Sequence, residues 1–216
     1  VSEGKNSPAD ILLTVDAGRL VRAKDLGLLQ PILSKKLTNN IPAIMRDNEN
    51  YWFGLTLRAR VIVYASDRIK KHELSTYENL ADPKWEGRLV VRSSNNIYNQ
   101  SLLASLINKN GSKSALKWAK AVRTNMARKP RGNDRDQARA VASGVADLAV
   151  INTYYLGLLA NSSEKEDREV AKKLNIFFPN QDENGTHINI SGGAVTASSK
   201  NKEDATRFLE FLTEEE

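Results

Sequence analysis

Three of the six tyrosines follow expected strands, where their side chains could act together on one ligand. Tyr98 comes after the apolar run 87–91 and a polar loop, and Tyr154 and Tyr155 come directly after the apolar run 147–151. In an α/β fold, ligands bind at the loops beyond the carboxyl ends of strands. The spacing therefore predicts that the two loops lie at one rim of the sheet, where their phenol oxygens could meet.

Phenolate oxygens are hard donors, and Fe(III) is a hard trivalent cation that suits such donors. Three phenolates would neutralise its three charges. A free phenol loses its proton only near a pKa of about 10, but a bound cation removes that obstacle because coordinated groups deprotonate. The alternative is structural, since adjacent tyrosines can bury one ring and hydrogen-bond one hydroxyl. The tyrosine spacing alone leaves both interpretations open.

Other reactive side chains are scarce in the sequence. There is no cysteine, which excludes a disulfide framework, a thiolate metal site and a cysteine nucleophile. The two histidines, His72 and His187, are far apart and lack the paired spacing of zinc ligands. No Gly-x-Ser-x-Gly motif occurs, so a hydrolase has little support.

The 216 residues, 40% of them hydrophobic, are enough to bury a sizeable core. Apolar β-branched runs predict strands at 11–15, 60–64, 87–91, 147–151, 175–179 and 189–197. Helical spacing of apolar residues predicts helices at 102–107, 115–126, 134–142 and 202–212. Asp134 is expected to cap the third helix, and Gly192–Gly193 to break the last strand. This alternation is typical of an α/β protein with largely parallel sheets.

The net charge of +6 is concentrated in one stretch of the chain. From Lys117 to Arg139 there are eight basic and two acidic residues, which equals the whole net charge. Such a stretch can bind nucleic acid, but only Trp118 interleaves it with an aromatic ring. A solvated helix face is the other interpretation. No window approaches eighteen consecutive apolar residues, so the sequence predicts no membrane-spanning helix.

Five segments together resemble the ferric-ion-binding periplasmic proteins of ABC transporters. They are the Asp-Ala-Gly segment Ala9–Gly18, the crossing-strand segment Trp52–Tyr64, the turn Asp82–Arg88, and the tyrosine segments Ser94–Gln100 and Asn152–Tyr155. The resemblance covers nearly the whole chain, and the order and spacing of the segments make it specific. The subgroup that looks most similar is the cyanobacterial type, which uses several tyrosines.

This resemblance implies an α/β protein with the type II periplasmic-binding-protein fold, a two-lobed clamp with a hinge of crossing strands. Lobe one is expected to comprise residues 1–62 and 189–216, and lobe two residues 63–188. In the family, further ligands, a tyrosine and often a histidine, precede the segment that matches Ala9–Gly18. About forty to fifty residues are therefore expected to be missing before the present start, leaving the first lobe incomplete.

The resemblance also implies roles for individual side chains. Tyr98, Tyr154 and Tyr155 match the second-lobe ligands and are expected to bind Fe(III) directly. Arg58 matches an arginine behind the ligands, which would stabilise phenolate charge through a charge-assisted hydrogen bond. A solvated arginine at a strand edge is the alternative for that position.

Asp16 follows the first expected strand and has two interpretations. It could line the binding cleft or accept a hydrogen bond from Arg19 or Arg58. The alternative is a plain turn carboxylate.

The implied function is that of the substrate-binding subunit of a ferric-iron ABC importer, and not that of an enzyme. Such a protein is a periplasmic monomer that captures Fe(III), closes about its crossing strands and docks on a permease in the inner membrane. We expect no nucleic-acid partner. Two alternatives stay open, a clamp of the same fold for a polyamine or an oxyanion, and a basic nucleic-acid-binding domain that uses residues 117–139.

Overall fold

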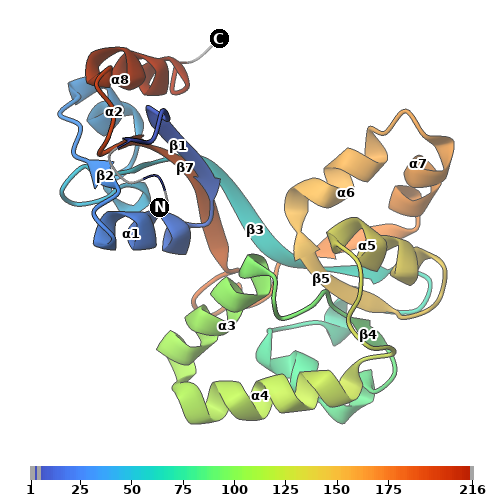
Figure 1. The fold of residues 1–216 in the computed structure, drawn as a ribbon. Helices are drawn as coiled ribbons and strands as arrows, with labels where there is room; N and C mark the ends of the chain where they lie inside the picture. Colours follow the sequence, from blue (N-terminus) through green and yellow to red (C-terminus); the bar gives the residue numbers. More distant parts are fainter. Residues whose placement is uncertain (1–2, 4–5, 215–216) are drawn as a thin grey trace. The chain divides into compact units, whose positions relative to one another are not determined.

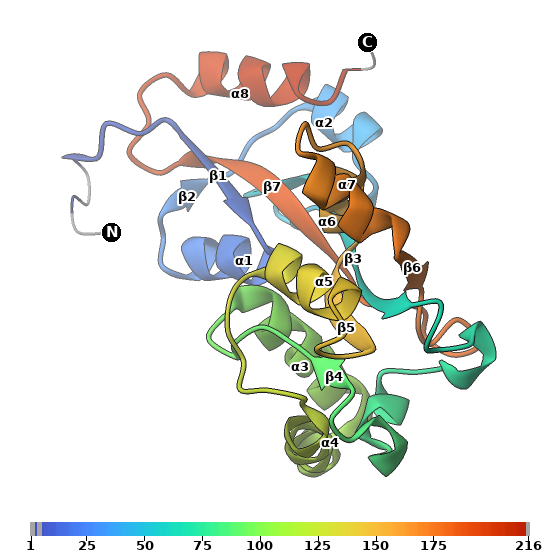
Figure 2. The ribbon, with the colours of Figure 1, turned by 90° about the vertical axis from the view of Figure 1, so that its right-hand side faces the viewer.

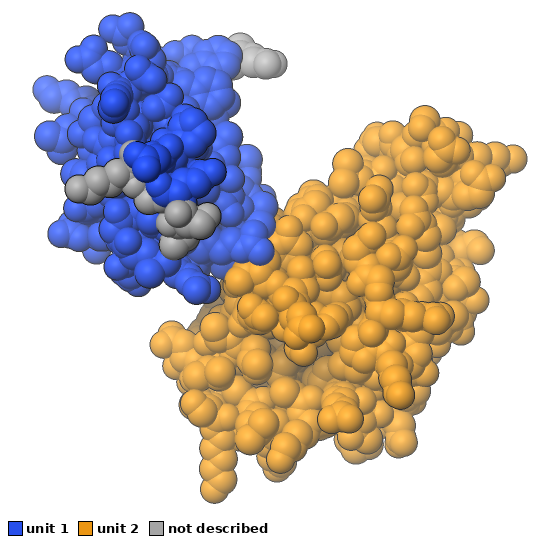
Figure 3. Space-filling view, in the orientation of Figure 1, with its two compact units in different colours: residues 1–57, 189–216 blue, residues 58–188 orange. Residues whose placement is uncertain are grey.

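The chain divides into two compact units, which Figure 3 shows in different colours. The first unit comprises residues 1–57 and 189–216, and the second residues 58–188. The predicted lobe boundary at residue 62 lies a little further along the same strand. The identification of these units with the lobes of a clamp stays a prediction.

The computed structural model describes Glu3 and residues 6–214. The first lobe was predicted to include residues 1–2, 4–5 and 215–216, which lie outside the described part. Within the described part, no helix has both the length and the apolar character needed to cross a membrane.

An antiparallel arrangement of strands forms the centre of the first unit (Figure 1). β7 pairs antiparallel with both β1 and β2, placing Ile11 opposite Val195 and Leu29 opposite Thr196. The elements of this unit are β1 (Ile11–Val15), α1 (Ala17–Asp25), β2 (Leu29–Gln30), α2 (Lys35–Asn40), a 3-10 helix (Ala43–Met45), the start of β3 (Phe53–Ala65), nearly all of β7 (Ile188–Thr196) and α8 (Lys202–Phe211).

Helices cover both faces of this small sheet (Figure 2). Leu20 and Ala23 of α1 pack with Ala194 on one face. Leu37 of α2 and Leu209 of α8 pack with Val195 on the other. Because side chains alternate along a strand, neighbouring residues of β7 serve opposite clusters.

Gly192 and Gly193 do not break β7, so that prediction was wrong. The strand runs unbroken through both glycines. A Cβ at Gly192 would lie 2.5 Å from the carbonyl oxygen of Phe53, and a Cβ at Gly193 would lie 2.6 Å from Cδ2 of Leu209. The glycines are therefore required for close packing beside the strand and not for a turn.

The second unit contains a four-stranded sheet in the order β4–β5–β3–β6. Its further elements are 3-10 helices (Lys71–Glu73, Glu78–Ala81, Pro83–Trp85), β4 (Leu89–Val90), α3 (Ile97–Asn110), α4 (Ser112–Asn125), α5 (Asp134–Ala142), β5 (Leu148–Asn152), α6 (Thr153–Ala160), α7 (Lys165–Lys172) and β6 (Leu174–Phe177).

The prediction of largely parallel sheets was wrong. Among the strand pairs described, only β4 and β5 run parallel, whereas β3 runs antiparallel to both β5 and β6. Helices connect β4 to β5 and β5 to β6, and these three strands do point in one direction, as crossover connections require. The long strand β3 lies between β5 and β6 and opposes both.

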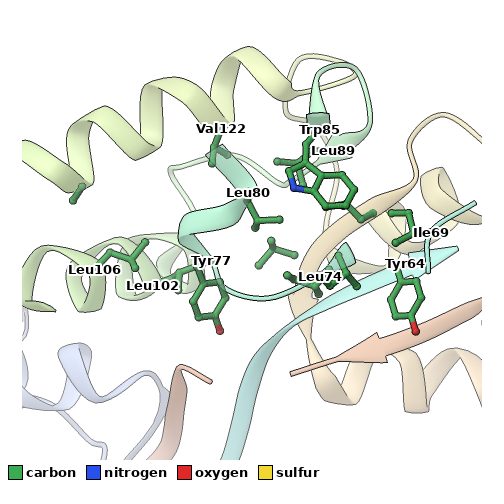
Figure 4. Packing of buried hydrophobic residues seen from close by; sticks show 14 residues of the cluster. Tyr64, Ile69, Leu74, Tyr77, Leu80, Trp85, Leu89, Leu102, Leu106 and Val122 are labelled. Carbon is green, nitrogen blue, oxygen red and sulfur yellow. The ribbon is translucent and has the colours of Figure 1, made fainter. Parts of the chain in front are cut away.

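Both faces of the second sheet are buried. On one face, Ile62 and Val150 belong to a cluster with residues of α3 and α4, including Leu102 and Val122 (Figure 4). On the other face, alternate residues of β3 and β5 pack with α5, α6 and α7. This double burial explains why the two strands read as nearly continuous apolar runs in the sequence.

Asn133, not Asp134, caps α5. Its Oδ1 accepts hydrogen bonds from the backbone N–H groups of Arg135 (2.9 Å) and Asp136 (3.2 Å). The carboxylate of Asp136 accepts the N–H of Asn133 in return, at 2.8 Å, which completes a capping box. The side chain of Asp134 is thereby left for a different, fully buried interaction.

Candidate metal centre

The structure brings the predicted tyrosines together within the second unit. The hydroxyl of Tyr154 donates a hydrogen bond to that of Tyr98 over 3.4 Å, although 56 residues separate them in sequence. The rings of Tyr154 and Tyr155 lie 4.3 Å apart between centroids, tilted by 35°. Two segments of the chain therefore supply a compact group of three phenols.

Both segments present their tyrosines in the first turn of a helix. Tyr98 is the second residue of α3, where the Oδ1 of Asn96 accepts its backbone N–H at 3.0 Å. Tyr154 and Tyr155 follow the first residue of α6, which begins directly where β5 ends. The amino end of a helix carries partial positive charge and favours anions. Both helix ends are thus suited to phenolate oxygens.

The surroundings of Tyr154 favour its neutral phenol form. Burial raises the pKa of Tyr154 above its usual value, and hydrogen bonding with Tyr155 and Tyr98 raises it further. Asn152 acts in the opposite direction but does not reverse the shift. A cation that binds this oxygen must therefore displace a proton.

Three arginines surround the ring of Tyr98. The guanidinium carbons of Arg58, Arg92 and Arg60 lie 5.0, 5.7 and 5.9 Å from its centroid. Arg58 and Arg60 are both buried, and they are two residues apart on β3. Cations this close interact with the ring face and give the site a positive electrostatic potential.

Arg60 also contacts side chains from the two segments that carry the tyrosines. Its Nη2 donates to the Oδ1 of Asn99 at 2.6 Å, next to Tyr98 in sequence. Its Nη1 donates to Asp134 Oδ2 at 2.6 Å and to Asn152 Oδ1 at 3.3 Å. The same carboxylate oxygen of Asp134 accepts the backbone N–H of Asn152 at 3.1 Å. One buried ion pair therefore joins β3, α3, α5 and the end of β5.

This network positions the tyrosines without including them. Arg60 is 2% exposed and the Asp134 side chain 0%, so neither charge can exchange its partner for water. Asn99 is further fixed because its Nδ2 donates to the carbonyl of Arg92 at 2.7 Å. Buried polar groups that are hydrogen-bonded to one another in this way hold neighbouring segments in one arrangement, although Arg60 Nε and Asn152 Nδ2 have no partner within the described part of the chain.

Arg58 and Asp16, the other two predicted site residues, are both buried. Arg58 is only 6% exposed, which argues against a solvated arginine at a strand edge. Asp16, in the first unit, caps α1 by accepting the N–H of Gly18 at 3.0 Å, and it also accepts Asn189 Nδ2 at 2.8 Å. Its φ of 83° is strained for an aspartate. A role for Arg58 or Asp16 in metal binding stays a prediction.

Sequence reasoning missed Arg60, Asp134 and Arg92. One signal was available for Arg60, because it lies two residues from Arg58 on a strand and so points to the same face. For Asp134 the sequence suggested only a helix cap. Its buried partner is 74 residues away, and no local pattern indicates such a pair.

The donor set at this site is restricted. Within the described part of the chain, no group of three or more His, Cys, Asp or Glu residues is placed to hold a metal ion. Any metal bound by several side chains of the described part would therefore need other donors. The hydroxyls of Tyr98 and Tyr154 are such donors, and the fold brings them close together.

Comparisons with known proteins agree with the resemblance noted in the sequence. Residues 6–216 match the family described as bacterial extracellular solute-binding protein. Iron uptake protein A1 of Synechocystis sp. is 52% identical over 214 residues, which cover 99% of this chain and 59% of that protein. The chain thus spans about three fifths of the length of this curated relative.

Solved structures of iron-binding proteins are also similar to this chain. The structure described as Trichodesmium IdiA (FutA) in complex with iron and citrate has a TM-score of 0.94 and 55% identity, covering 99% of this chain and 67% of that one. The ferric binding protein from Campylobacter jejuni also has a TM-score of 0.94, with 51% identity over 98% of this chain and 67% of its own. The predicted α/β fold of periplasmic iron-binding proteins is confirmed.

Proposed function

The chain belongs to the family of bacterial extracellular solute-binding proteins, and we propose that its solute is Fe(III), held by the phenolate oxygens of Tyr98, Tyr154 and Tyr155. The observation that carries the proposal is the 3.4 Å approach of the Tyr98 and Tyr154 hydroxyls. Oxygen ligands of hard cations lie about 2.0–2.6 Å from the ion, so two ligands of one ion are separated by about 3 to 4 Å.

The surroundings of the phenols favour a strongly charged cargo. Arg58, Arg60 and Arg92 supply positive charge close to Tyr98, and two helix amino ends add to it. These charges stabilise phenolates, but they also oppose a cation that the phenolates do not fully neutralise. Three phenolates and one trivalent ion are electrically balanced, which supports Fe(III) over a weakly bound monovalent or divalent ion.

The family and the named relatives support a role in iron import. We propose that the protein is the substrate-binding subunit of a ferric-iron ABC importer, which works in the periplasm and delivers its ion to a permease in the inner membrane. Two relatives are named for iron uptake and ferric binding, and a third is described with iron bound. The closing motion about the crossing strands stays part of this proposal.

The visible absorption spectrum tests whether these tyrosines bind Fe(III). Charge transfer from phenolate to Fe(III) should produce a visible absorption band when ferric citrate is added to the protein. The double variant Tyr154→Phe/Tyr155→Phe should lose the band, because it removes two of the three donors and little volume. Tyr51→Phe, which changes a tyrosine of the first unit, is the matched control and should keep it. An unchanged band in the double variant contradicts the assignment.

An oxyanion clamp is the second candidate. The arginines around Tyr98 favour it over a polyamine clamp, because guanidinium groups bind anions and repel ammonium groups. Calorimetric titration of the iron-free protein with phosphate, sulfate and spermidine at one pH separates these cases. Tight binding of an anion, together with no response to ferric citrate, would favour the oxyanion clamp over the iron proposal.

The basic stretch 117–139 keeps a nucleic-acid interaction as the remaining alternative. Part of its charge is already paired, since Arg139 contacts Asp136 at 3.2 Å and Asp167 at 2.8 Å. Retention on heparin that collapses as salt rises would support nucleic-acid binding. Elution at low salt would count against it.

A further inference from the structure

A separate cavity of about 560 Å³ lies within the second unit, between α3, α4 and the loop that precedes α3. Most of its lining is apolar and includes Leu102, Trp118, Val122 and Met126. Leu102 and Val122 also belong to the core cluster of Figure 4. Small-molecule sites are typically cavities of about 300–1,000 Å³ with an apolar lining and a few polar groups, as found here.

The charges around this cavity all have one sign. Its lining contains Arg92, Arg123 and Lys129 and no aspartate or glutamate among the described residues. An apolar cavity with cationic residues in its lining is complementary to a molecule that combines an apolar body with a negative charge. A neutral or cationic ligand would not form an ion pair with these cationic side chains.

Arg92 has donor capacity left for such a ligand. Its Nε is buried and has no hydrogen-bond partner within the described part of the chain. Its Nη1 makes a long contact with Asp134 Oδ1, at 3.5 Å, whereas the shorter bonds of that carboxylate go to Arg60 and to the backbone of Asn152. Buried polar groups are normally paired with protein or ordered water, so an unpaired donor on a residue of the cavity lining is available to a group that binds there.

We propose that this cavity binds an amphipathic carboxylate, a monoanion with an aromatic or branched apolar body. The carboxylate pairs with Arg92, which can offer two parallel N–H donors to it. The body packs against Trp118, Leu102 and Val122. This part of the proposal does not depend on what the tyrosines bind.

Arg92 connects the cavity with the tyrosine group, because its guanidinium carbon lies 5.7 Å from the ring of Tyr98. A bound carboxylate would compensate the positive charge of Arg92 and so reduce its support for a phenolate at Tyr98. We therefore expect the carboxylate to weaken Fe(III) binding several-fold, and Fe(III) to weaken carboxylate binding by the same factor. This coupling rests on the proposed iron-binding function.

The first experiment uses iron-free protein and calorimetry with 2-naphthoate, and with 2-naphthylmethanol as its neutral analogue. We expect the naphthoate to bind at least about tenfold more tightly. Arg92→Gln should reduce naphthoate affinity to that of the alcohol. Ala119→Trp, which fills the cavity from α4, should abolish binding of both ligands. Arg131→Gln changes a basic residue outside this lining and is the matched control.

Thermal unfolding of each variant shows whether it is folded, and Leu103→Trp provides a second cavity-filling variant if Ala119→Trp is not. Equal affinity for naphthoate and the alcohol, or naphthoate binding that survives both Arg92→Gln and a folded cavity-filling variant, overturns the carboxylate site. Ferric citrate titration with and without naphthoate then tests the coupling. Naphthoate binding with no effect on a normal iron band overturns the coupling alone, and absence of any band contradicts the iron proposal.

Discussion

Tyr77 and Tyr154 lie in two regions of the second unit, and both have a raised pKa, but their hydroxyl groups have different partners. Burial raises the pKa of both tyrosines. Tyr77 has its ring in the apolar cluster of Figure 4, and its hydroxyl donates to the carbonyl of Arg60 and accepts the N–H of His187. Tyr154 is 39% exposed, and its hydroxyl faces another phenol.

This difference shows that a raised pKa does not by itself identify a ligand. The Tyr77 oxygen already has backbone partners, so its burial serves packing. The Tyr154 oxygen can exchange a weak contact with Tyr98 for a bond to a metal ion. Arg60 links both regions, since its carbonyl accepts from Tyr77 while its guanidinium holds Asn99 and Asn152 beside the other tyrosines.

The largest expected effect comes from removing Asp134, the charge partner of Arg60, because Arg60 contacts both regions. Asp134→Ala would leave a buried guanidinium uncompensated and lower the free energy of unfolding by about 3–5 kcal/mol. Urea unfolding followed by circular dichroism measures the change. Asp136→Ala, which removes the more exposed carboxylate of the capping box two residues away, should cost only about 1 kcal/mol. Similar losses in the two variants would contradict the role of the buried pair.

The next prediction separates the two regions directly. Tyr98→Phe should lower the affinity for Fe(III) by at least about a hundredfold, because even residues behind metal ligands contribute 10–100-fold. Its unfolding free energy should change by less than about 0.5 kcal/mol. Tyr77→Phe should do the reverse, costing about 1–3 kcal/mol of stability because the carbonyl of Arg60 and the N–H of His187 lose their hydroxyl partner.

Competition against citrate measures the iron affinities of these two variants, and urea unfolding their stabilities. If Tyr77→Phe weakens iron binding as much as Tyr98→Phe does, the distinction between a packing tyrosine and a ligand tyrosine fails.

A smaller effect concerns pH. Because the raised pKa keeps Tyr154 protonated at neutral pH, Fe(III) must release that proton on binding. Affinity should therefore rise with pH, by about tenfold per pH unit for each proton released. Competition titrations between pH 5 and 7 give the slope. Tyr154→Phe should reduce that slope by one proton, and an identical slope in the variant would mean that Tyr154 is not a ligand.

The smallest expected effect is confined to the region around Tyr77. Burial alone would raise the pKa of Glu78, but hydrogen bonds from Asn180, Asn110 and Lys109 outweigh it and bring the pKa to about 2. Since this pKa is lower than that of the unfolded chain, the stability it contributes is complete above about pH 4.5 and decreases as the pH falls toward 2. Thermal unfolding across this range should show a flatter acid dependence in Glu78→Gln than in the unchanged protein. Curves that coincide would contradict the assignment.

Much of the fold followed from local patterns. The strand at 11–15 agrees with the structure, and the run 60–64 lies within the longer β3. β-branched runs predict strands because such side chains suit a pleated, buried surface. The same patterns could not predict that β3 lies antiparallel between β5 and β6. They also misjudged Gly192, whose necessity depends on the carbonyl of Phe53, far away in sequence.

For the candidate site, the sequence by itself determined the available chemistry. It contains no cysteine, only two histidines, and tyrosines placed just after expected strands, so phenol oxygens were the donors to consider. Spacing along one segment also determines which residues share a helix turn or a strand face, because those periods are local.

Only the tertiary structure decided that Tyr98 and Tyr154 meet, and that Arg60 and Asp134 form a buried pair. These partners are 56 and 74 residues apart. Contacts over such separations depend on how strands pair and how helices cover them. No local period of the sequence encodes that pairing, so the positions of the Tyr98 and Tyr154 hydroxyls depend on how the second sheet is assembled.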